Sequence, residues 1–400
     1  MNPDDVKPEA RAEKGRDETR GEGRIADETV LSAVRREIDA IDEDILELLN
    51  RRARVSRRVG RIKAGGSGQV FKPGREEKLL EKLGRMNQGP LPDEHLRAIY
   101  REIISSSRSL QRTISVVYLG PEGTFSHFAG LSYLGASSEY TPRPHIEGVF
   151  ASVASGEADL GVIPIENSLQ GAVGQSLDCL MKYGVHVQAE LFARISHCLM
   201  AKGGELSDVR RVLSHPQPLE QCGGWLRANL PGAELLPVES TAAAARKVAA
   251  GRGQGSAAIG HPRLAAMTGL NVLAAPIEDY PDNWTRFFVI SRAANKPGPE
   301  NAKTSIIFTT PDKPGALAGV LDVLAAQDVN LSKLESRPVK GEKWRYAFFA
   351  DLECDLGRED NAAALAGLAD ACASLKVLGA YPRGPLLDTK PDSAAAPEDA

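Results

Sequence analysis

The spacing of apolar residues changes near residue 112, and this change constrains the fold more than any other feature of the sequence. Between about residues 28 and 62, apolar residues recur every three or four positions, which predicts one long helix. From residue 114 onward, short apolar runs alternate with helix-like segments, which predicts an α/β arrangement with a mostly parallel sheet. The chain has 400 residues, too many for one hydrophobic core, so we expect several domains.

We predict a helical domain over residues 25–112, with a short second helix over about 75–83 and a third that Asp93 caps. Arg52 and Lys63 fall inside the apolar stripe of the first helix, at about 100° per residue. The simplest explanation is that long side chains reach past a packed surface to water.

The third helix favours a binding site instead. Its stripe continues with Ser107 and Gln111, so hydrogen-bonding groups replace apolar ones at the same spacing. Cations and a donor amide inside a helical bundle indicate a site for a small anion. Arg35 lies about 110° from this stripe, so we expect it to serve a neighbouring site.

Between residues 113 and 295, polar side chains repeatedly follow apolar runs. The segments 162–168 and 283–287 both leave a predicted strand with carboxylate, amide, hydroxyl or guanidinium groups. Ligands of open α/β sheets bind at the carboxyl ends of strands, so we expect one polar cleft between two lobes. The turn at 120–126 adds glycines and hydroxyls before a helix, where an anion is favoured. For the segment 239–241, helix capping is a sufficient explanation.

The last domain is predicted over residues 302–384, in the order βαββαβ, with helices on an antiparallel sheet. A linker with Pro297 and Pro299 precedes it. The segments 1–24 and 385–400 are poor in large apolar residues, and we predict that both are disordered.

Composition narrows the class of protein. The net charge of −4 argues against nucleic acid as the main partner, and no apolar run approaches the ~20 residues that span a bilayer. The N-terminus lacks the apolar core of a signal peptide, so we expect a cytoplasmic protein. The five cysteines lack Cys-x-x-Cys spacing and the seven histidines lack metal-ligand spacing, so we expect neither disulfides nor a metal.

Four segments together resemble the motifs of prephenate dehydratase: Gly120–Ser126, Pro164–Gly171, Ser214–Pro218 and Thr285–Phe287. The helical segment before them resembles chorismate mutase, and the segment behind them resembles an ACT regulatory domain. The match covers roughly residues 30–384 and is that of the bifunctional chorismate mutase/prephenate dehydratase family of phenylalanine synthesis. The resemblance implies an all-α domain, a two-lobed α/β domain similar to periplasmic binding proteins, and an α+β ACT domain.

For the mutase, the resemblance implies an intertwined dimer in which the partner subunit supplies one arginine. The residues it assigns to this site are Arg35 (from the partner), Arg52, Lys63, Arg75, Glu76, Ser107 and Gln111. The rearrangement of chorismate needs no nucleophile, so cations and amides that hold the substrate and stabilise its breaking ether oxygen suffice. Lys72 stands where one family pattern has an aspartate that contacts the substrate hydroxyl.

For the dehydratase, the resemblance implies that Thr285 is the essential residue. The substrate-binding residues it implies are Thr124, Ser126, Glu166, Asn167, Ser168, His215, Arg286 and Phe287. Arg286 and the 120–126 backbone suit the two carboxylates of prephenate. A threonine hydroxyl is a poor acid, so either Glu166 or His215 is a candidate general acid. No cofactor is expected.

For the ACT domain, the resemblance implies an effector site for L-phenylalanine at a subunit interface of a homodimer or higher oligomer. The residues concerned are Gly315, Ala316, Leu317, Glu335, Ser336 and Arg337. Inhibition requires that the effector bind a less active state more tightly.

Three other hypotheses remain. The basic run from Arg51 to Lys63 contains no acid, as in helices that bind RNA, although no aromatic residues are interleaved. Alternatively, the helical domain only dimerises a dehydratase. A third hypothesis is a phenylalanine-sensing protein without catalysis, against which the joint presence of Thr285, Arg286, Glu166 and Asn167 speaks.

Overall fold

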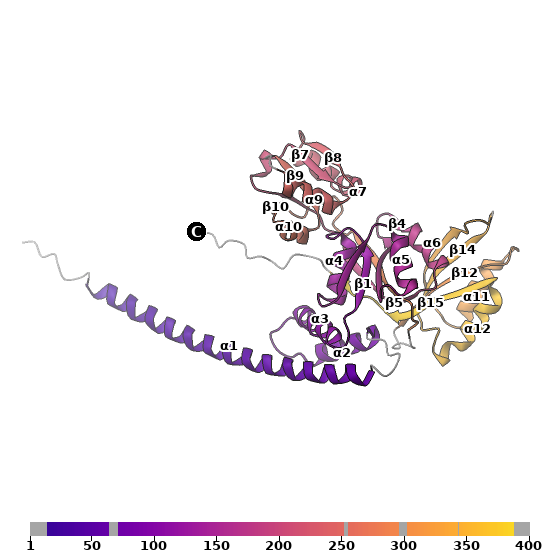
Figure 1. Cartoon of the computed structure of the whole chain (residues 1–400), viewed down its shortest axis with the longest axis horizontal. Coiled ribbons are helices and arrows are strands. Elements are labelled where there is room, and N and C mark those ends of the chain that lie inside the picture. The colour runs from indigo at the N-terminus through magenta and orange to yellow at the C-terminus, as the bar shows by residue number, and fades with distance from the viewer. Residues whose placement is uncertain (1–13, 64–70, 252–254, 296–301, 343, 388–400) are drawn as a thin grey trace, which may run out of the picture. The chain divides into compact units, whose positions relative to one another are not determined.

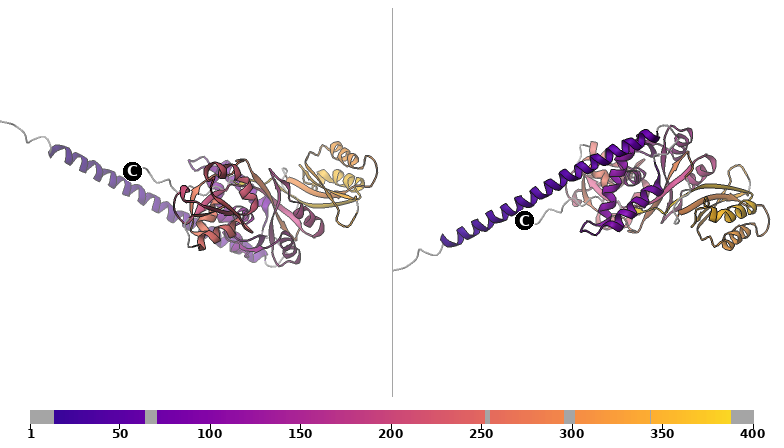
Figure 2. Two further views of the ribbon diagram at one scale, coloured as in Figure 1. Left: turned by 90° about the horizontal axis from the view of Figure 1, so that it is seen from above. Right: turned by 90° about the horizontal axis from the view of Figure 1, so that it is seen from below.

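The computed structural model describes residues 14–63, 71–251, 255–295, 302–342 and 344–387, with only the backbone for 14–27 and residue 63. Two compact units, residues 1–67 and 68–400, divide the chain. Figures 1 and 2 show their elements, and each unit is described by itself. The predicted helical domain is thus divided after its first helix. The expected linker prolines, Pro297 and Pro299, lie outside the described residues.

Helix α1 (Lys14–Lys63) is the described part of the first unit, and Figure 2 shows it as one continuous helix. Its apolar stripe has the predicted spacing, but the stripe is exposed to solvent: Ile38 is 52% exposed, Ile41 51% and Ile45 47%. Burying such a side chain stabilises a protein by about 1.5–3 kcal/mol. A second surface is therefore needed to cover this face of α1.

The start of α1 differs from the prediction of a disordered segment over residues 1–24, because the helix already begins at Lys14. The prediction rested on the lack of apolar residues. Glutamate, lysine and arginine nevertheless have high helix propensity, and extending an existing helix is cheap compared with nucleating one. Residues 1–13 lie outside the described residues.

The second unit begins with helices α2 (Pro73–Met86) and α3 (Asp93–Ser109), which precede the first lobe of an α/β domain. Six strands of this lobe form the path β16-β5-β11-β3-β1-β2, and β4 pairs with β3 outside it. Their bounds are β1 Ser115–Leu119, β2 Glu139–Arg143, β3 Leu160–Asn167, β4 Gly171–Ala172, β5 His186–Arg194, β11 Trp284–Ser291 and β16 Leu386–Leu387. The helices are α4 Phe125–Leu134, α5 Ile146–Ser155 and α6 Gly174–Lys182.

The second lobe has a five-stranded sheet in the order β10-β6-β9-β7-β8. The strands are β6 Cys198–Ala201, β7 Arg211–Ser214, β8 Glu234–Pro237, β9 Ser256–Gly260 and β10 Asn271–Ala274. The helices are the 3₁₀ turn η1 Leu206–Asp208, α7 Pro216–Gln221, α8 Gly223–Asn229, α9 Thr241–Ala250 and α10 Pro262–Thr268. The chain enters this lobe after β5 and returns along β11, so two crossings join the lobes. The predicted two-lobed domain is confirmed.

The prediction of a mostly parallel sheet is wrong, because both sheets are mixed. In the first lobe, β1 is parallel to β2 and β3, but β11 is antiparallel to β3 and β5. In the second lobe, β7 is parallel to β8 and β9, whereas β6 is antiparallel to β9 and β10. A strand that returns from the other lobe enters the sheet from the opposite end, which alternating strand and helix patterns do not reveal.

The C-terminal domain has the predicted βαββαβ order and an antiparallel sheet, β13-β14-β12-β15. Its elements are β12 Ala302–Thr309, α11 Ala316–Ala326, β13 Leu331–Pro338, β14 Tyr346–Leu352, η2 Glu359–Asn361, α12 Ala362–Ala371 and β15 Ser374–Pro382. Phe349 and Tyr381 of this domain belong to the same buried cluster as Phe288 and Ile290 of β11. The two domains therefore share a core.

The end of the described chain corrects the prediction that residues 385–400 are disordered. Leu386 and Leu387 form β16, which pairs in parallel with Phe192 and Ala193 of β5. Leu387 is 6% exposed and packs in the core of the first lobe, whereas Leu386 is 70% exposed. Because β5 would otherwise be an edge strand, its free backbone groups favour one more strand. Residues 388–400 lie outside the described residues.

Across the ranges that the structure describes, none of the helices combines the length and the apolar composition needed to cross a bilayer.

Candidate functional site

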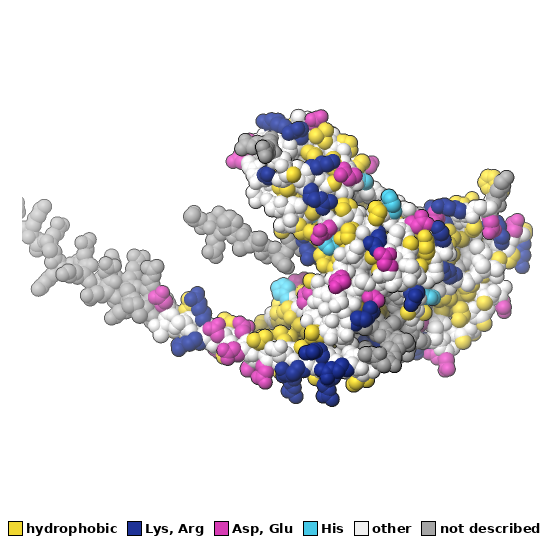
Figure 3. All heavy atoms as spheres, viewed as in Figure 1, with side chains coloured by type: hydrophobic (Ala, Val, Ile, Leu, Met, Phe, Trp, Pro, Cys, Tyr) yellow, Lys and Arg dark blue, Asp and Glu magenta, His cyan; other side chains and the backbone are white. Residues whose placement is uncertain are grey.

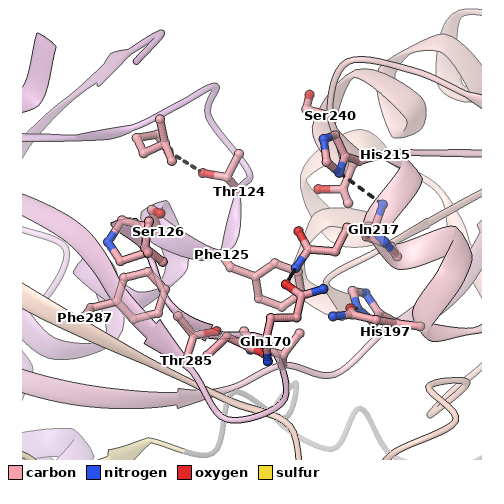
Figure 4. Close-up of a pocket in the computed structure, with 18 of the residues that line it drawn as sticks. Thr124, Phe125, Ser126, Gln170, His197, His215, Gln217, Ser240, Thr285 and Phe287 are labelled. Carbon is pink, nitrogen blue, oxygen red and sulfur yellow. Dashed lines mark hydrogen bonds between the residues drawn. The ribbon is translucent and has the colours of Figure 1, made fainter. Parts of the chain in front are cut away.

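A cleft of about 470 Å³ lies between the two lobes, within the size range of small-molecule sites. Figure 4 shows side chains of both lobes facing each other across it. The first lobe contributes Leu119, Gly120, Thr124, Phe125, Ser126, Pro164, Asn167, Gln170, Gly171, Ala172, Val173, Thr285 and Phe287. The second lobe and the first crossing contribute Ile195, His197, His215, Gln217, Pro218, Gln221, Glu239, Ser240 and Thr241.

Asn167 and Thr285 lie opposite each other at the cleft ends of β3 and β11, which are antiparallel neighbours. Asn167 Nδ2 donates to Thr285 Oγ1 at 3.0 Å and to Asn283 Oδ1 at 2.7 Å. Asn167 Oδ1 accepts the backbone N–H groups of Leu169 and Gln170, both at 3.1 Å. Since a backbone N–H can only donate, these bonds fix which end of the amide is Nδ2. Thr285 Oγ1 therefore accepts a bond, and its proton is free to point into the cleft.

Helix α4 begins at the cleft with an N-terminus that no side chain caps. Thr124 occupies the cap position, but its hydroxyl donates to the carbonyl of Leu119 at 2.9 Å. The preceding turn depends on Gly123, which has φ +88° and where a Cβ would lie 2.5 Å from Leu264 Cδ1. An uncapped helix N-terminus attracts anions. Ser126, in the first turn of α4, also lines the cleft.

The opposite wall belongs to the second lobe. His215 caps α7, with Nδ1 accepting the backbone N–H of Gln217 at 3.3 Å. In the neutral ring the proton is then on Nε2. Ser240 caps α9 through the backbone N–H of Ala243 at 3.0 Å. Gln217 Nε2 donates to Gln170 Oε1 at 2.5 Å, so this bond joins the two lobes across the cleft (Figure 4).

Two fully buried histidines, His197 and His261, flank Phe125 with ring centroids 5.4 and 5.3 Å from it. His197 Nε2 lies 2.9 Å from Gln221 Oε1 and therefore carries the ring proton, and within the described structure its buried Nδ1 has no hydrogen-bond partner. Burial lowers the pKa of His197. Burial, with Arg263 nearby, lowers the pKa of His261 to about 3. Both rings are therefore neutral near pH 7.

The structure corrects the prediction that Arg286 binds the substrate carboxylates and that Glu166 faces the cleft. Successive side chains of a strand point to opposite faces, and both residues alternate with Thr285 and Asn167 onto the face away from the cleft. Arg286 is 4% exposed and pairs with Glu190 at 2.5 Å. Glu166 therefore drops out as the general acid, which leaves His215.

Ser168 is a second correction, because it does not line the cleft. Its Oγ accepts the backbone N–H of Trp284 at 2.9 Å, so it ties the loop after β3 to the start of β11. The predicted cleft residues Thr124, Ser126, Asn167, His215, Thr285 and Phe287 do line it.

The predicted mutase residues fall on both units. Arg35, Arg52 and Lys63 lie on α1, and Arg75, Glu76 and Ser107 on α2 and α3, with Gln111 just after α3. The predicted mutase residues on α1 and those on α2 and α3 are therefore described separately, and the mutase site stays a prediction.

The predicted mutase residues on α2 and just after α3 make several contacts within their own unit. Glu76 pairs with Arg108 at 2.6 Å, and burial raises the pKa of this carboxyl. Gln111 Nε2 donates to the carbonyl of Ser107 at 3.1 Å, and Oε1 of the same amide is buried without a partner in the described chain. Exposed Lys72 precedes α2.

The predicted effector residues lie at the start of α11 and on the edge strand β13. Gly315 has φ +77° and precedes α11, where no side chain caps the helix. Ala316 and Leu317 form the first turn of α11. On β13, Glu335 is partly buried and Ser336 exposed, while Arg337 Nη2 pairs with Asp178 of α6 at 3.2 Å.

Where side chains are described, no group of three or more histidine, cysteine, aspartate or glutamate residues has the arrangement of a metal site.

Three family models match the chain: chorismate mutase type II over residues 34–112, prephenate dehydratase over 116–295 and the ACT domain over 304–370. The bifunctional chorismate mutase/prephenate dehydratase of Aquifex aeolicus is 42% identical over 358 residues, covering 88% of this chain and 98% of the relative. That of Pseudomonas aeruginosa is 37% identical and covers 90% of this chain and all of the relative.

A solved structure of prephenate dehydratase from Arthrobacter aurescens in complex with L-Phe is also similar. It is 36% identical, with a TM-score of 0.63, and the match covers 70% of this chain and 93% of that one. The matched domains define a multidomain enzyme of aromatic amino-acid synthesis. The chain belongs to the bifunctional chorismate mutase/prephenate dehydratase family.

Sequence reasoning missed several cleft residues. Gln170 lies inside a motif segment that draws attention to its carboxylate and amide neighbours instead, and His197 follows β5 where the chain leaves the sheet. Ser240 was explained as a helix cap, which it is, although it also lines the cleft. The available signal was the same for all three: a polar side chain just beyond a strand.

We predict that His261 makes stability depend on pH. Its pKa is about 3 in the folded chain and 6.5 when unperturbed, so below pH 6.5 the unfolded chain binds a proton that the folded chain does not. Stability is then lost by up to about 1.4 kcal/mol for each pH unit between 6.5 and about 3. In His261→Asn, which keeps a capping side chain, the melting temperature should fall less steeply with pH than in the native protein.

The matched control is His95→Gln, at a histidine whose side chain is 63% exposed. This variant should follow the native pH profile. Equal slopes for His261→Asn and the native protein would contradict the assignment.

Proposed function

We propose that the cleft between the lobes converts prephenate to phenylpyruvate, with Thr285 donating a hydrogen bond to the departing C4 hydroxyl. The observation that carries this proposal is the bond from Asn167 Nδ2 to Thr285 Oγ1 at 3.0 Å, which leaves the threonine proton for the substrate. One carboxylate leaves as CO₂, its electron pair makes the ring aromatic, and hydroxide leaves from C4 and takes up a proton. His215, which lines the cleft, is the candidate general acid for that proton.

In this proposal the N-terminus of α4, rather than Arg286, binds the carboxylates of the substrate. The uncapped N-terminus of α4 offers backbone N–H groups at the cleft, with the Ser126 hydroxyl beside them. These groups suit the anionic substrate and add no proton-transfer requirement.

We expect Thr285→Ala to lower kcat for prephenate by about 10²–10³-fold, the usual effect of removing one donor to developing charge. Thr285→Ser keeps the hydroxyl and should stay within about tenfold of the native kcat. Phenylpyruvate formation is followed with purified prephenate, and unchanged melting temperatures show that both variants fold. Native-like activity of Thr285→Ala would remove Thr285 from the reaction.

The N-terminal helices are proposed to rearrange chorismate within a homodimer of this cytoplasmic enzyme. The exposed stripe of α1, with Ile38, Ile41 and Ile45 each about half exposed, supports a second copy as its covering surface. Arg52 and Lys63 of one subunit and Arg35 of the partner would meet the substrate. Within the described residues the buried Oε1 of Gln111 has no partner, which supports a polar ligand beside α3.

Complementation tests both the dimer and the shared site. Arg35→Ala and Arg52→Ala should each lose most mutase activity, by about 10²-fold or more, and keep dehydratase activity. When the two variants are co-expressed, a mixed dimer contains one site with both arginines, because the site takes Arg35 from the partner. Random pairing then restores about a quarter of the native mutase activity, since half of the dimers are mixed.

Mutase activity that is unchanged in Arg52→Ala would instead support a purely dimerising role for the helices. Failure to complement, with both single variants inactive, would place Arg35 in its own subunit's site.

L-Phenylalanine is proposed to bind at Gly315–Leu317 and Glu335–Arg337 and to inhibit the dehydratase. The uncapped start of α11, with Gly315 at φ +77°, supports binding of a carboxylate by backbone N–H groups. The similar Arthrobacter protein was solved in complex with L-Phe.

In Gly315→Val, the branched side chain strains the left-handed backbone and blocks close approach. The L-phenylalanine concentration for half inhibition should rise by about tenfold or more, a loss of at least about 1.4 kcal/mol of binding. Gly319→Ala is the control, since a Cβ at this helical position meets no atom within 4 Å. Native-like inhibition of Gly315→Val would move the effector site elsewhere.

A further inference from the structure

A buried ion-pair cluster lies directly behind the proposed catalytic threonine. Arg286 Nη1 is 2.5 Å from Asp351 Oδ2 of β14, and Arg286 Nη2 is 2.5 Å from Glu190 Oε2 of β5. Arg286 Nη2 also donates to Tyr381 Oη of β15 at 3.3 Å. Lys303 of β12 lies 3.5 Å from Glu190 and balances the charge. Arg286 therefore joins β11, the strand that carries Thr285, to β14 and β15 of the ACT sheet and to the neighbouring strand β5.

This cluster is costly to bury. The side chains of Arg286, Glu190 and Asp351 are 4%, 2% and 1% exposed, and Arg286 lies 4.8 Å over the ring of Phe288. Apolar residues of similar size in such a place are often neutral or stabilising relative to an ion pair. The cluster does, however, fix the position of its strands, because a guanidinium held in two ion pairs has one geometry.

A second ion pair lies behind the other cleft residue, Asn167. The neighbouring Glu166 has its Oε1 2.6 Å from Lys333 Nζ of β13, with side chains 34% and 13% exposed. Lys333 is two residues before Glu335, so the two share one face of β13. Asn167 is thus one residue from a contact with the strand that carries the proposed effector residues.

The register of the strands makes both contacts important for the cleft. The pairing of β11 with β3 shifts between Arg286 and Phe287, where Ile165 is the extra residue. Beyond this bulge only two residue pairs remain, Thr285 with Asn167 and Arg286 with Glu166. A bulge disrupts the ladder and re-aims the strand. On their other edges these residues stay paired within the sheet, Thr285 and Arg286 with β5 and Glu166 and Asn167 with β4. The ACT sheet adds contacts on the face away from the cleft, through Lys333 and Asp351.

We propose that Glu166 and Arg286 are positioning residues of the dehydratase reaction, which hold Asn167 and Thr285 in place through ion pairs with Lys333 and Asp351 of the ACT sheet. This inference rests on the proposed roles of Asn167 and Thr285. Neither positioning residue touches the substrate. An effector that moves β13 then shifts the Glu166 contact, and the cleft responds without any residue reaching it from the ACT domain.

The Glu166–Lys333 pair provides the main test, because it is the less buried of the two. Lys333→Met and Glu166→Gln should each lower kcat for prephenate by about tenfold while KM stays within about twofold, since small misplacements reduce the rate strongly. The double variant should be no slower than either single variant, because both remove the same interaction. The charge-swapped variant, Glu166→Lys with Lys333→Glu, should recover most of the lost rate.

Lys340→Met is the matched control. Lys340 Nζ pairs with Asp178 Oδ2 at 2.9 Å across the same domain boundary, but this pair involves α6 and neither β3 nor β11. Its kcat should match that of the native enzyme. A loss of rate in Lys340→Met equal to that in Lys333→Met would mean that any ion pair at this boundary acts alike, and would overturn the assignment.

The response to L-phenylalanine distinguishes a positioning role from a merely structural one. Calorimetric titration measures binding of the effector, and kcat is measured with and without it. Lys333→Met should still bind the effector, but saturating effector should change its kcat by a smaller factor than in the native enzyme. Arg286→Lys keeps the charge and loses the two-pronged contact, so it should lower kcat with the fold retained by circular dichroism.

The outcomes separate this inference from the proposed function. If Thr285→Ala is as active as the native enzyme, the proposed cleft chemistry fails. If Thr285→Ala is inactive while Lys333→Met and Glu166→Gln keep native kcat and native inhibition, the positioning role fails alone. Additive losses in the double variant, or no recovery on swapping the charges, also overturn it.

Discussion

The pairing of Asn167 with Thr285 across the last rungs of β3 and β11 is the interaction on which the proposed dehydratase site depends. One face of this short ladder presents an amide and a hydroxyl to the cleft, with Asn167 Nδ2 3.0 Å from Thr285 Oγ1. The other face presents Glu166 and Arg286 to the ACT sheet. The alternation of side chains along a strand thus places the proposed catalytic residues next to the proposed positioning residues in the sequence.

Around this ladder, the two lobes supply complementary groups. The first lobe offers an uncapped helix start at α4 for an anion. The second lobe offers His215 and the Gln217 contact that bridges to Gln170. The basic side chains seen on α1 in Figure 3 belong to a different unit, which carries part of the predicted mutase site. In both proposed sites the required chemistry is recognition of carboxylates.

Much of this organisation could be predicted from the sequence, because apolar spacing reports helices and strands directly. The three domains, the βαββαβ order and Asn167, His215 and Thr285 as cleft residues were predictable. The positions of Arg286 and Glu166 outside the cleft were not predictable in this way. A motif taken as one continuous run does not show which of its side chains face the ligand and which face the opposite side of the sheet. The antiparallel entry of β11 and the pairing of β16 depend on contacts between distant segments, for which local pattern holds no signal.

The short strand β16 has a consequence for the architecture of the whole second unit. The ACT domain follows β11 in the sequence, and after its last strand the chain returns to pair with β5. The regulatory domain is therefore flanked in the sequence by two strands of one catalytic sheet, as an inserted domain would be. Recombination or engineering that exchanges ACT domains at a single junction would separate Leu387 from the core that it completes. An exchange that keeps β16 requires two junctions, one on each side of the ACT domain. The ACT domain is therefore harder to exchange independently of the catalytic domain.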